Sequence, residues 1–387
     1  MNRDPQVRLR AILADRVFDG GDFHDRTAVL IEGPHIRGLR GWREVPSGAE
    51  QVRLPAGALL APGFIDLQVN GGGGVLLNDQ PTAHGIRAIA RAHRKFGTTG
   101  CLPTLITDRR ERMEAVIAAA PAALGKGVLG LHIEGPFLNP ARKGVHRPEL
   151  IRAPDEADLA LLRGLASVGR SMVTLAPERV PDGFVRALVQ SGVRVAAGHS
   201  EASAAEMARA ADDGLTGVTH LFNAMPPLAG RAPGIVGATL SEPRLIAGII
   251  VDGVHVDPVS IRAAYAAKGA AGLALVTDAM PTVGSNVDHF ELMGRRVTLA
   301  DGRLTIEDGT LGGAHLDMAA AVRNAVRIGV PLADALQSAA LTPARFLGIA
   351  DQRGALREGA YADLVALTPE LDVIATWIEG EEEPPPD

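Results

Sequence analysis

The chain lacks several features that mark common classes of protein. Its 387 residues include one cysteine, Cys101, which excludes an internal disulfide and a cysteine-rich zinc site. No apolar run approaches the roughly 20 residues of a membrane-spanning helix, and the first ten residues lack the apolar core of a signal peptide. There is no lysine-rich block, and 39 basic against 45 acidic residues give a formal charge of -6. These absences predict a cytoplasmic protein that binds neither membranes nor nucleic acid.

Apolar residues are plentiful, because 46% of the chain is hydrophobic, which is enough for one large domain and a smaller one. Eight short strand-like runs follow one another, and helix signals fall between them. The clearest helix is opened by Asp257 and Pro258, covers residues 259–268 and stops at Gly269, and another covers about 201–213. This alternation predicts a (β/α)8 barrel. The eight runs are 64–69, 98–105, 128–133, 172–176, 193–197, 217–219, 245–251 and 273–277.

The two ends of the chain have a different texture. Residues 1–60 contain short β-prone pieces, and similar pieces return at 354–367 and 373–378, after a predicted helix at 331–341 and a turn at Thr342 and Pro343. We expect residues 1–60 and 350–387 to pair into one small β-sandwich domain beside a barrel formed by 61–349. The last nine residues, EGEEEPPPD, are expected to be a frayed tail. The glycine-punctuated segment 281–313 is either a flap over the site or a plain β-hairpin insertion.

Polar residues stand just after several predicted strands, where a (β/α)8 barrel builds its active site. Glu134, His199 and His220 offer one carboxylate and two imidazoles, a ligand set that suits zinc or ferrous iron and leaves a position open for water. Asp278, after the eighth run, is a candidate to accept and return a proton, with a helix N-cap as the alternative. A histidine considered singly is more often a hydrogen-bonded structural residue, and this interpretation is favoured for His132. The alternative is a partner that orients Glu134, because His132 lies two residues earlier on the same side of the strand.

Three other positions are candidates for substrate contacts. His146 lies in the loop after Glu134 and could donate to a carbonyl oxygen, unless it is a solvent-exposed loop residue. Arg231 and His255 could bind an anion, because a guanidinium matches phosphate oxygens, although a surface ion pair explains Arg231 equally well.

At these residues the chain closely resembles the N-acetylglucosamine-6-phosphate deacetylases of the amidohydrolase superfamily. The resemblance covers nearly the whole chain in the family's order, and HIEGPFLNP and HLFNAMPP are its most specific parts. The matching stretches are PGFIDLQVNGGGG at 62–74, LHIEGPFLNPARKGVH at 131–146, GHS at 198–200, THLFNAMPPLAGR at 219–231, DGVHVD at 252–257, LVTDAM at 275–280, TPAR at 342–345 and GALREGAYADLV at 354–365.

The resemblance implies a role for each matching position. It implies that Glu134, His199 and His220 bind one divalent metal ion, Zn²⁺ or Fe²⁺, that Asp278 is the catalytic acid and base, and that His146 contacts the acetamide carbonyl. Arg231 and His255 would hold the phosphate, and the enzyme would be a homodimer whose second subunit supplies part of that pocket. The implied sugar-phosphate contacts are Val145, His146, Asn223, Ala224, Arg231, Asp252, Gly253, Val254, His255, Leu311, Gly312 and Gly313.

The chain departs from relatives with two metal ions at the end of the first strand. Where many amidohydrolases carry His-x-His, this chain has Gln68 and Asn70, and amides replace imidazoles poorly as ligands. A single metal ion is therefore expected. Ala314 and His315 also depart from the family's usual loop, which commonly has a small hydroxyl residue at the first position and a residue other than histidine at the second. The sugar contacts that the resemblance implies for this loop therefore have less sequence support.

The expected function is hydrolysis of N-acetyl-D-glucosamine 6-phosphate to D-glucosamine 6-phosphate and acetate. The alternatives are the same reaction on another N-acylated amine, such as N-acetylgalactosamine 6-phosphate or an N-acyl amino acid, and a non-catalytic scaffold built on the same barrel.

Overall fold

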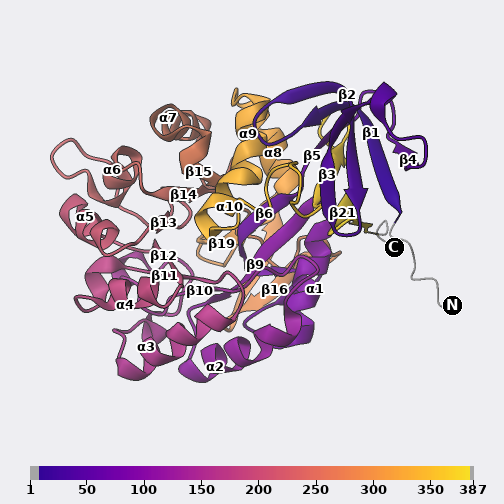
Figure 1. Cartoon of the computed structure of the whole chain (residues 1–387). Coiled ribbons are helices and arrows are strands. Elements are labelled where there is room, and N and C mark those ends of the chain that lie inside the picture. Colours follow the sequence, from indigo (N-terminus) through magenta and orange to yellow (C-terminus); the bar gives the residue numbers. More distant parts are fainter. Residues whose placement is uncertain (1–7, 384–387) are drawn as a thin grey trace.

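A computed structural model describes residues 8–383, which form a barrel and a second, sheet-rich part (Figure 1). All eight barrel strands predicted from the sequence are confirmed, and each is parallel to its neighbours. The ring closes where Val69 bridges to Ala279 and the Asp278 amide donates to the Gln68 carbonyl at 3.0 Å. In ring order the strands are β6 (Phe64–Val69), β9 (Thr98–Ile106), β10 (His132–Glu134), β11 (Met172–Leu175), β12 (Arg194–Ala197), β13 (Gly217–Val218), β14 (Ile246–Ile249) and β15 (Leu273–Leu275).

Helices follow the barrel strands and cover the outside of the ring (Figure 1). In the predicted helix α7, Asp257 is the N-cap, Pro258 is the first residue and Gly269 is the C-cap. Helix α5 starts later than expected because Ser203 and Glu206 form a capping box. The helices are α1 (Ala83–Arg94), α2 (Arg110–Ala119), α3 (Glu156–Arg163), α4 (Phe184–Gln190), α5 (Ala204–Asp212), α6 (Gly234–Ser241), α7 (Pro258–Lys268), α8 (Met318–Arg327), α9 (Leu332–Ala339) and α10 (Leu341–Leu347).

One predicted turn is wrong. Thr342 and Pro343 lie in the first turn of α10, where a proline is tolerated because its missing N–H would have no partner within the helix. None of the helices in residues 8–383 has both the length and the hydrophobicity needed to cross a bilayer.

The two ends of the chain pair into a β-domain, as predicted. β5 runs antiparallel to β20, so that the indigo and yellow strands of Figure 1 lie side by side, and all eight strands are joined in one sheet. Its core contains Trp377, which is 1% exposed. The strands are β1 (Leu9–Phe18), β2 (Phe23–Glu32), β3 (His35–Gly41), β4 (Glu50–Arg53), β5 (Leu59–Pro62), β20 (Leu364–Leu367), β21 (Val373–Ile378) and β22 (Glu381–Glu382).

The predicted frayed tail is wrong for its first part. β22 pairs with Trp377 and Ile378, and Glu383 forms an ion pair of 2.6 Å with Arg94. Residues 384–387 lie outside the described residues, as do residues 1–7.

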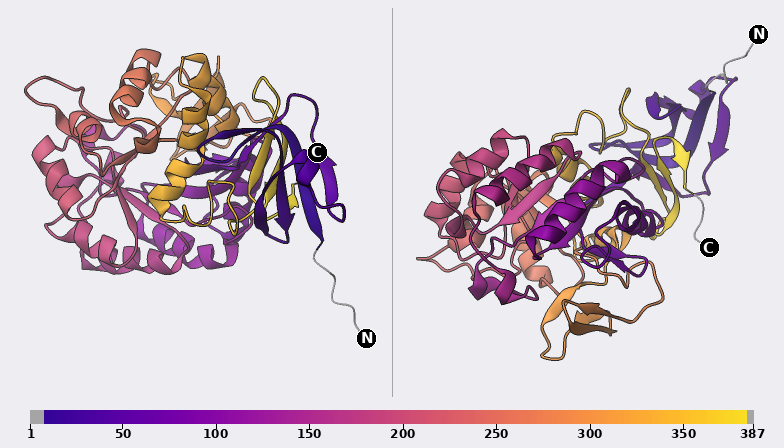
Figure 2. Two further views of the ribbon diagram at one scale, coloured as in Figure 1. Left: turned by 45° about the horizontal axis from the view of Figure 1, so that its top comes forward. Right: turned by 90° about the horizontal axis from the view of Figure 1, so that it is seen from below.

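The segment that interrupts the barrel pattern is larger than a hairpin. β16 (His289–Leu292), β17 (Arg295–Ala300), β18 (Arg303–Thr305) and β19 (Leu311–Ala314) form an antiparallel sheet that stands away from the barrel in the right view of Figure 2. Its apolar face packs on Val145 and Met280, and the Ala314 amide donates to the Asp278 carbonyl at 2.9 Å. The insertion therefore contacts the rim through both its apolar face and its last strand. A short hairpin of β7 (Gly71–Gly72) and β8 (Val75–Leu76) follows β6.

Candidate active site

The predicted chemical residues gather at the carboxyl ends of the barrel strands. Glu134 ends β10, His199 and His220 follow β12 and β13 by two residues, and Asp278 follows β15 by three. The backbone φ angles of His199, His220 and Asp278 are 48°, 33° and 52°, a left-handed conformation that residues other than glycine rarely adopt. Such strained backbone concentrates at functional sites, where the surrounding fold holds it in place.

Glu134, His199 and His220 converge on one point. The Glu134 Oε1 atom lies 3.1 Å from His220 Nε2 and 3.2 Å from His199 Nε2, and the two nitrogens are 3.0 Å apart. Ligand atoms bonded at about 2.0 to 2.2 Å to one cation lie roughly 3.0 to 3.5 Å from one another. The donor set therefore fits a divalent metal ion with nitrogen and carboxylate ligands.

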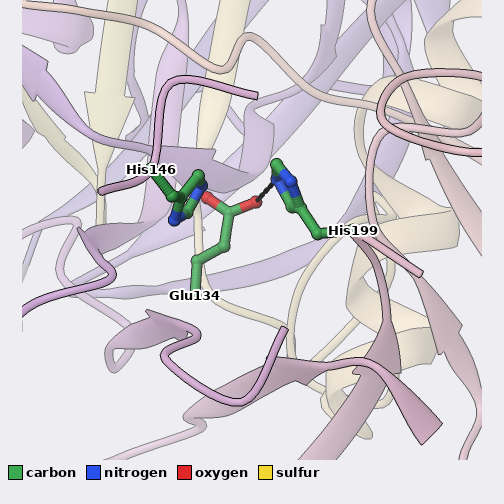
Figure 3. Close-up of side chains that lie close together, drawn as sticks. All are labelled: Glu134, His146 and His199. Atoms are coloured by element: carbon green, nitrogen blue, oxygen red, sulfur yellow. Dashed lines mark ion pairs between the residues drawn. The ribbon is translucent and has the colours of Figure 1, made fainter. Parts of the chain in front are cut away.

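His146 also reaches this group. Its ring lies within 4.8 Å of the ligand atoms of Glu134 and His199, and Figure 3 shows the Glu134 carboxylate between the two rings. However, the His146 Nδ1 atom is hydrogen-bonded to Thr107 Oγ1 at 2.7 Å. His220 has two contacts of 3.0 and 3.1 Å with the other donors, so the tighter cluster is Glu134, His199 and His220.

The electrostatics of these buried groups follow from burial and from each other. Desolvation alone would raise the pKa of Glu134, but hydrogen bonds from His199 and His220 hold it well below its usual range. Burial lowers the pKa of His146 to about 3, and the neighbouring His199 contributes, so that this ring is neutral at physiological pH. The site thus combines an ionised carboxylate with a neutral imidazole.

Asp278 lines the same pocket as Glu134, His199 and His220. Its Oδ1 atom accepts from Asn70 Nδ2 at 2.6 Å and from Gln68 Nε2 at 3.1 Å. Burial and the negative charge of Glu134 raise its pKa, which suits a group that must take up and release a proton. The alternative of a helix N-cap is wrong, because the next residue, Ala279, bridges to two strands instead of opening a helix.

These side chains border a pocket of about 330 Å³. Of the predicted sugar-phosphate residues, those that line the pocket are Val145, His146, Asn223, Ala224, His255, Leu311 and Gly313. Asp252 stands behind the wall, where its Oδ2 atom lies 2.6 Å from His255 Nδ1 and its Oδ1 atom accepts from two backbone amides. Gly253, Val254 and Gly312 are outside the wall, and Arg231 is exposed in the loop before α6.

The sequence did not indicate several residues that belong to this site. Arg142, Thr310 and Met280 line the pocket, and the Arg142 carbonyl is 2.8 Å from His199 Nδ1, which leaves His199 Nε2 to face Glu134. These contacts use backbone atoms or ordinary side chains, which carry no sequence signal. The sequence marks Gln68 and Asn70 only as departures from a histidine pair.

Three comparisons with known proteins agree. The sequence pattern of the Amidohydrolase family matches residues 59–382. The chain belongs to this family. An N-acetylgalactosamine-6-phosphate deacetylase of Shewanella sp. (strain ANA-3) is 40% identical, over 96% of this chain and 95% of its own. An N-acetylglucosamine-6-phosphate deacetylase of Homo sapiens is 40% identical over 86% and 85%. The crystal structure of the enzyme of that name from Pasteurella multocida superimposes with a TM-score of 0.93, at 35% identity, over 97% and 99%.

In this amidohydrolase, His132 has the structural role that was expected for it. Its Nδ1 atom lies 3.1 Å from the Leu67 carbonyl and its Nε2 atom 2.7 Å from Thr174 Oγ1, without a bond to Glu134. Burial lowers its pKa to about 4, so the ring is neutral. It links β6 with β11 through hydrogen bonds to Leu67 and Thr174.

Proposed function

We propose that this amidohydrolase removes acetate from N-acetyl-D-glucosamine 6-phosphate and releases D-glucosamine 6-phosphate. The observation that carries the proposal is the convergence of Glu134, His199 and His220 opposite Asp278, in one pocket of a family member whose relatives bear deacetylase names. The other supports are the neutral His146 and the side chains of Asn223 and His255, which line the same pocket.

One divalent metal ion, Zn²⁺ or Fe²⁺, would be held by Glu134, His199 and His220. When bound, such an ion supplies Lewis-acid chemistry and makes water more acidic. Asp278 accepts a proton from the attacking water and then delivers it to the amide nitrogen, so that the C–N bond breaks as a neutral amine leaves. This proton return is essential because an unprotonated amine is a poor leaving group.

His146 would donate from Nε2 to the acetamide oxygen as negative charge develops there. This role sets a condition on its tautomer: Nδ1 must then accept a hydrogen bond from the Thr107 hydroxyl. The distance of 2.7 Å between Nδ1 and Thr107 Oγ1 is compatible with that arrangement.

His255 and the Asn223 and Ala224 region of the wall would hold the phosphate. Arg231 is exposed and outside the wall of its own pocket, so we propose that it completes the phosphate site of the other subunit in a homodimer. A cytoplasmic location stays a prediction from the sequence.

The test is acetate release from N-acetylglucosamine 6-phosphate, from its galacto epimer and from unphosphorylated N-acetylglucosamine, beside elemental analysis of the protein. We expect about one metal ion per chain and a much lower kcat/KM without the phosphate. Asp278→Asn should lower kcat by about 10²-fold or more while the metal stays bound. Near-normal turnover by this variant would contradict the assignment of Asp278.

A second candidate substrate is N-acetylgalactosamine 6-phosphate, which is favoured by the name of the Shewanella relative. A higher kcat/KM for the galacto sugar would replace the proposed substrate but leave the mechanism intact. A higher kcat/KM for an N-acyl amino acid would contradict the proposed phosphate site. A metal-loaded protein that is inert on all of these compounds would point to a scaffold.

A further inference from the structure

Two amide side chains at the end of β6 connect the proton carrier with the metal cluster. Gln68 is 2% exposed and Asn70 is fully buried. The Gln68 Nε2 atom lies 3.2 Å from each carboxylate oxygen of Glu134 and 3.1 Å from Asp278 Oδ1. Asn70 Nδ2 lies 2.6 Å from the same Asp278 oxygen and does not contact Glu134. The pair therefore links the Asp278 carboxylate to the Glu134 carboxylate through Gln68.

The chemistry of the neighbours determines which way these amides point. An ionised carboxylate can only accept hydrogen bonds, so the NH₂ groups of Gln68 and Asn70 must face Glu134 and Asp278. Hydrogen bonds to a charged acceptor are shorter and stronger than those between neutral groups. Two such bonds on one oxygen hold the carboxylate in a defined orientation.

Both bonds fall on Oδ1 of Asp278, and within residues 8–383 no hydrogen bond to Oδ2 is found. The backbone is tied to the same strand, because the Asp278 amide donates to the Gln68 carbonyl at 3.0 Å. Side chain and backbone are therefore anchored to β6 together, and Oδ2 remains available to exchange a proton.

We propose that Gln68 and Asn70 are positioning residues, which hold Asp278 by Oδ1 so that Oδ2 takes and returns the proton of the reaction. Neutral amides orient the carboxylate and leave its second oxygen free, whereas a second cation would occupy that oxygen. The inference rests on the proposed function, because it assigns to Asp278 the proton transfer described above.

The two amides have different contacts, which makes the proposal specific. Within residues 8–383 the side-chain hydrogen bond of Asn70 goes to Asp278 alone, so Asn70→Leu should lower kcat about tenfold to a hundredfold, with KM within threefold and the metal content unchanged. Gln68 also contacts Glu134, so Gln68→Met should lower kcat to a similar extent and weaken metal binding as well.

A matched control removes two buried hydrogen bonds at the far end of the barrel. Ser171 Oγ accepts from the Leu131 amide at 2.9 Å and donates to the Val168 carbonyl at 2.5 Å, just before β11. Ser171→Ala should lower the thermal midpoint while leaving kcat and metal content unchanged. A fall in kcat in Ser171→Ala equal to that in Asn70→Leu would overturn the proposal, because general loosening would then explain both.

A double-mutant cycle tests whether Asn70 acts through Asp278. In the Asp278→Ala background, adding Asn70→Leu should change neither the residual rate nor the calorimetric affinity for the sugar phosphate by more than threefold. A further loss as large as in the wild-type background would assign Asn70 another role and overturn the proposal.

A readout independent of turnover separates this inference from the proposed function. In crystals of metal-loaded Asn70→Leu protein, we expect the Asp278 carboxylate to rotate or to occupy more than one orientation, while Glu134, His199 and His220 stay in place. An Asp278 orientation identical to that of the wild type would overturn the positioning role. Failure of the wild-type enzyme to release acetate would contradict the proposed function alone.

Discussion

Asp66 should make the free energy of unfolding depend on pH, and its buried surroundings determine by how much. It lies in the middle of β6, its side chain has no exposed surface, and its Oδ1 atom accepts from the Gln68 amide at 3.1 Å and from the Thr277 amide at 3.3 Å. The Thr277 hydroxyl donates to its other oxygen. Asp66 thereby joins the strand that carries the amide pair to the strand that leads to Asp278.

Burial of this carboxyl raises its pKa from 3.8 to about 7, against the smaller opposing effect of these hydrogen bonds. The folded protein therefore binds the Asp66 proton more tightly than the unfolded chain does. The corresponding stability is complete below about pH 4, is lost as the pH rises to about 7, and stays lost above it. Each tenfold difference in proton affinity is worth about 1.4 kcal/mol, so the loss is about 4 kcal/mol.

Asp66→Asn keeps the size of the side chain and cannot ionise. Its NH₂ group can only donate, so it donates to the Thr277 hydroxyl as the protonated carboxyl would. We expect the free energies of unfolding of variant and wild type to agree near pH 4 and to differ by about 4 kcal/mol at pH 8, where the variant is more stable. The assay is urea denaturation followed by circular dichroism between pH 4 and 8, with both proteins metal-free because metal binding itself depends on pH. Asp182→Asn, at an exposed carboxylate, controls for the loss of one negative charge.

A difference between Asp66→Asn and wild type that is constant across this pH range would refute the reasoning. It would mean that Asp66 has the same proton affinity in the folded and unfolded states, in spite of its complete burial.

Three further outcomes are expected. Removal of the metal by a chelator should abolish acetate release and lower the thermal midpoint of unfolding. Adding Zn²⁺ or Fe²⁺ at a thousand times its Kd should restore about 4 kcal/mol of stability. An unchanged midpoint would count against a metal site formed by Glu134, His199 and His220. Arg295→Leu should raise KM about fivefold with little change in kcat, because Arg295 donates to the Val145 carbonyl in the pocket wall. Steady-state kinetics measure both constants, and a fall in kcat with unchanged KM would contradict this prediction. Trp377→Ala should cost about 3 to 5 kcal/mol in denaturation experiments, because it empties the β-domain core, yet leave kcat/KM unchanged in the fraction that stays folded.

The barrel could be predicted because its strands are short apolar runs with turn and cap signals between them. Periodicity and capping are local properties, and the Asp257, Pro258 and Gly269 signals of α7 were sufficient to place both of its ends. Boundaries that depend on tertiary contacts were missed. Pro343 looked like a turn residue but lies in the first turn of α10, and Glu383 looked like part of a tail but pairs with Arg94.

The candidate site was predictable as a set of residue types but not as a geometry. A carboxylate and two histidines after parallel strands indicate a metal site, since all such strand ends meet at one rim. The sequence could not indicate that Arg231 stays outside the wall of its own pocket, because loop direction depends on packing with distant segments. Nor could it indicate that the insertion reaches Val145 from more than a hundred residues away.

From the sequence alone, the barrel, its partner β-domain, the family and the metal-compatible donor set were determined, because each rests on local pattern or on residue identity. Only the tertiary structure decided how the donors relate in space. It placed His220 and His199 at hydrogen-bond distance from one oxygen of Glu134, and it turned Gln68 and Asn70 toward Asp278. The physical reason is that those distances depend on closure of the ring between β15 and β6, a contact between segments about 200 residues apart.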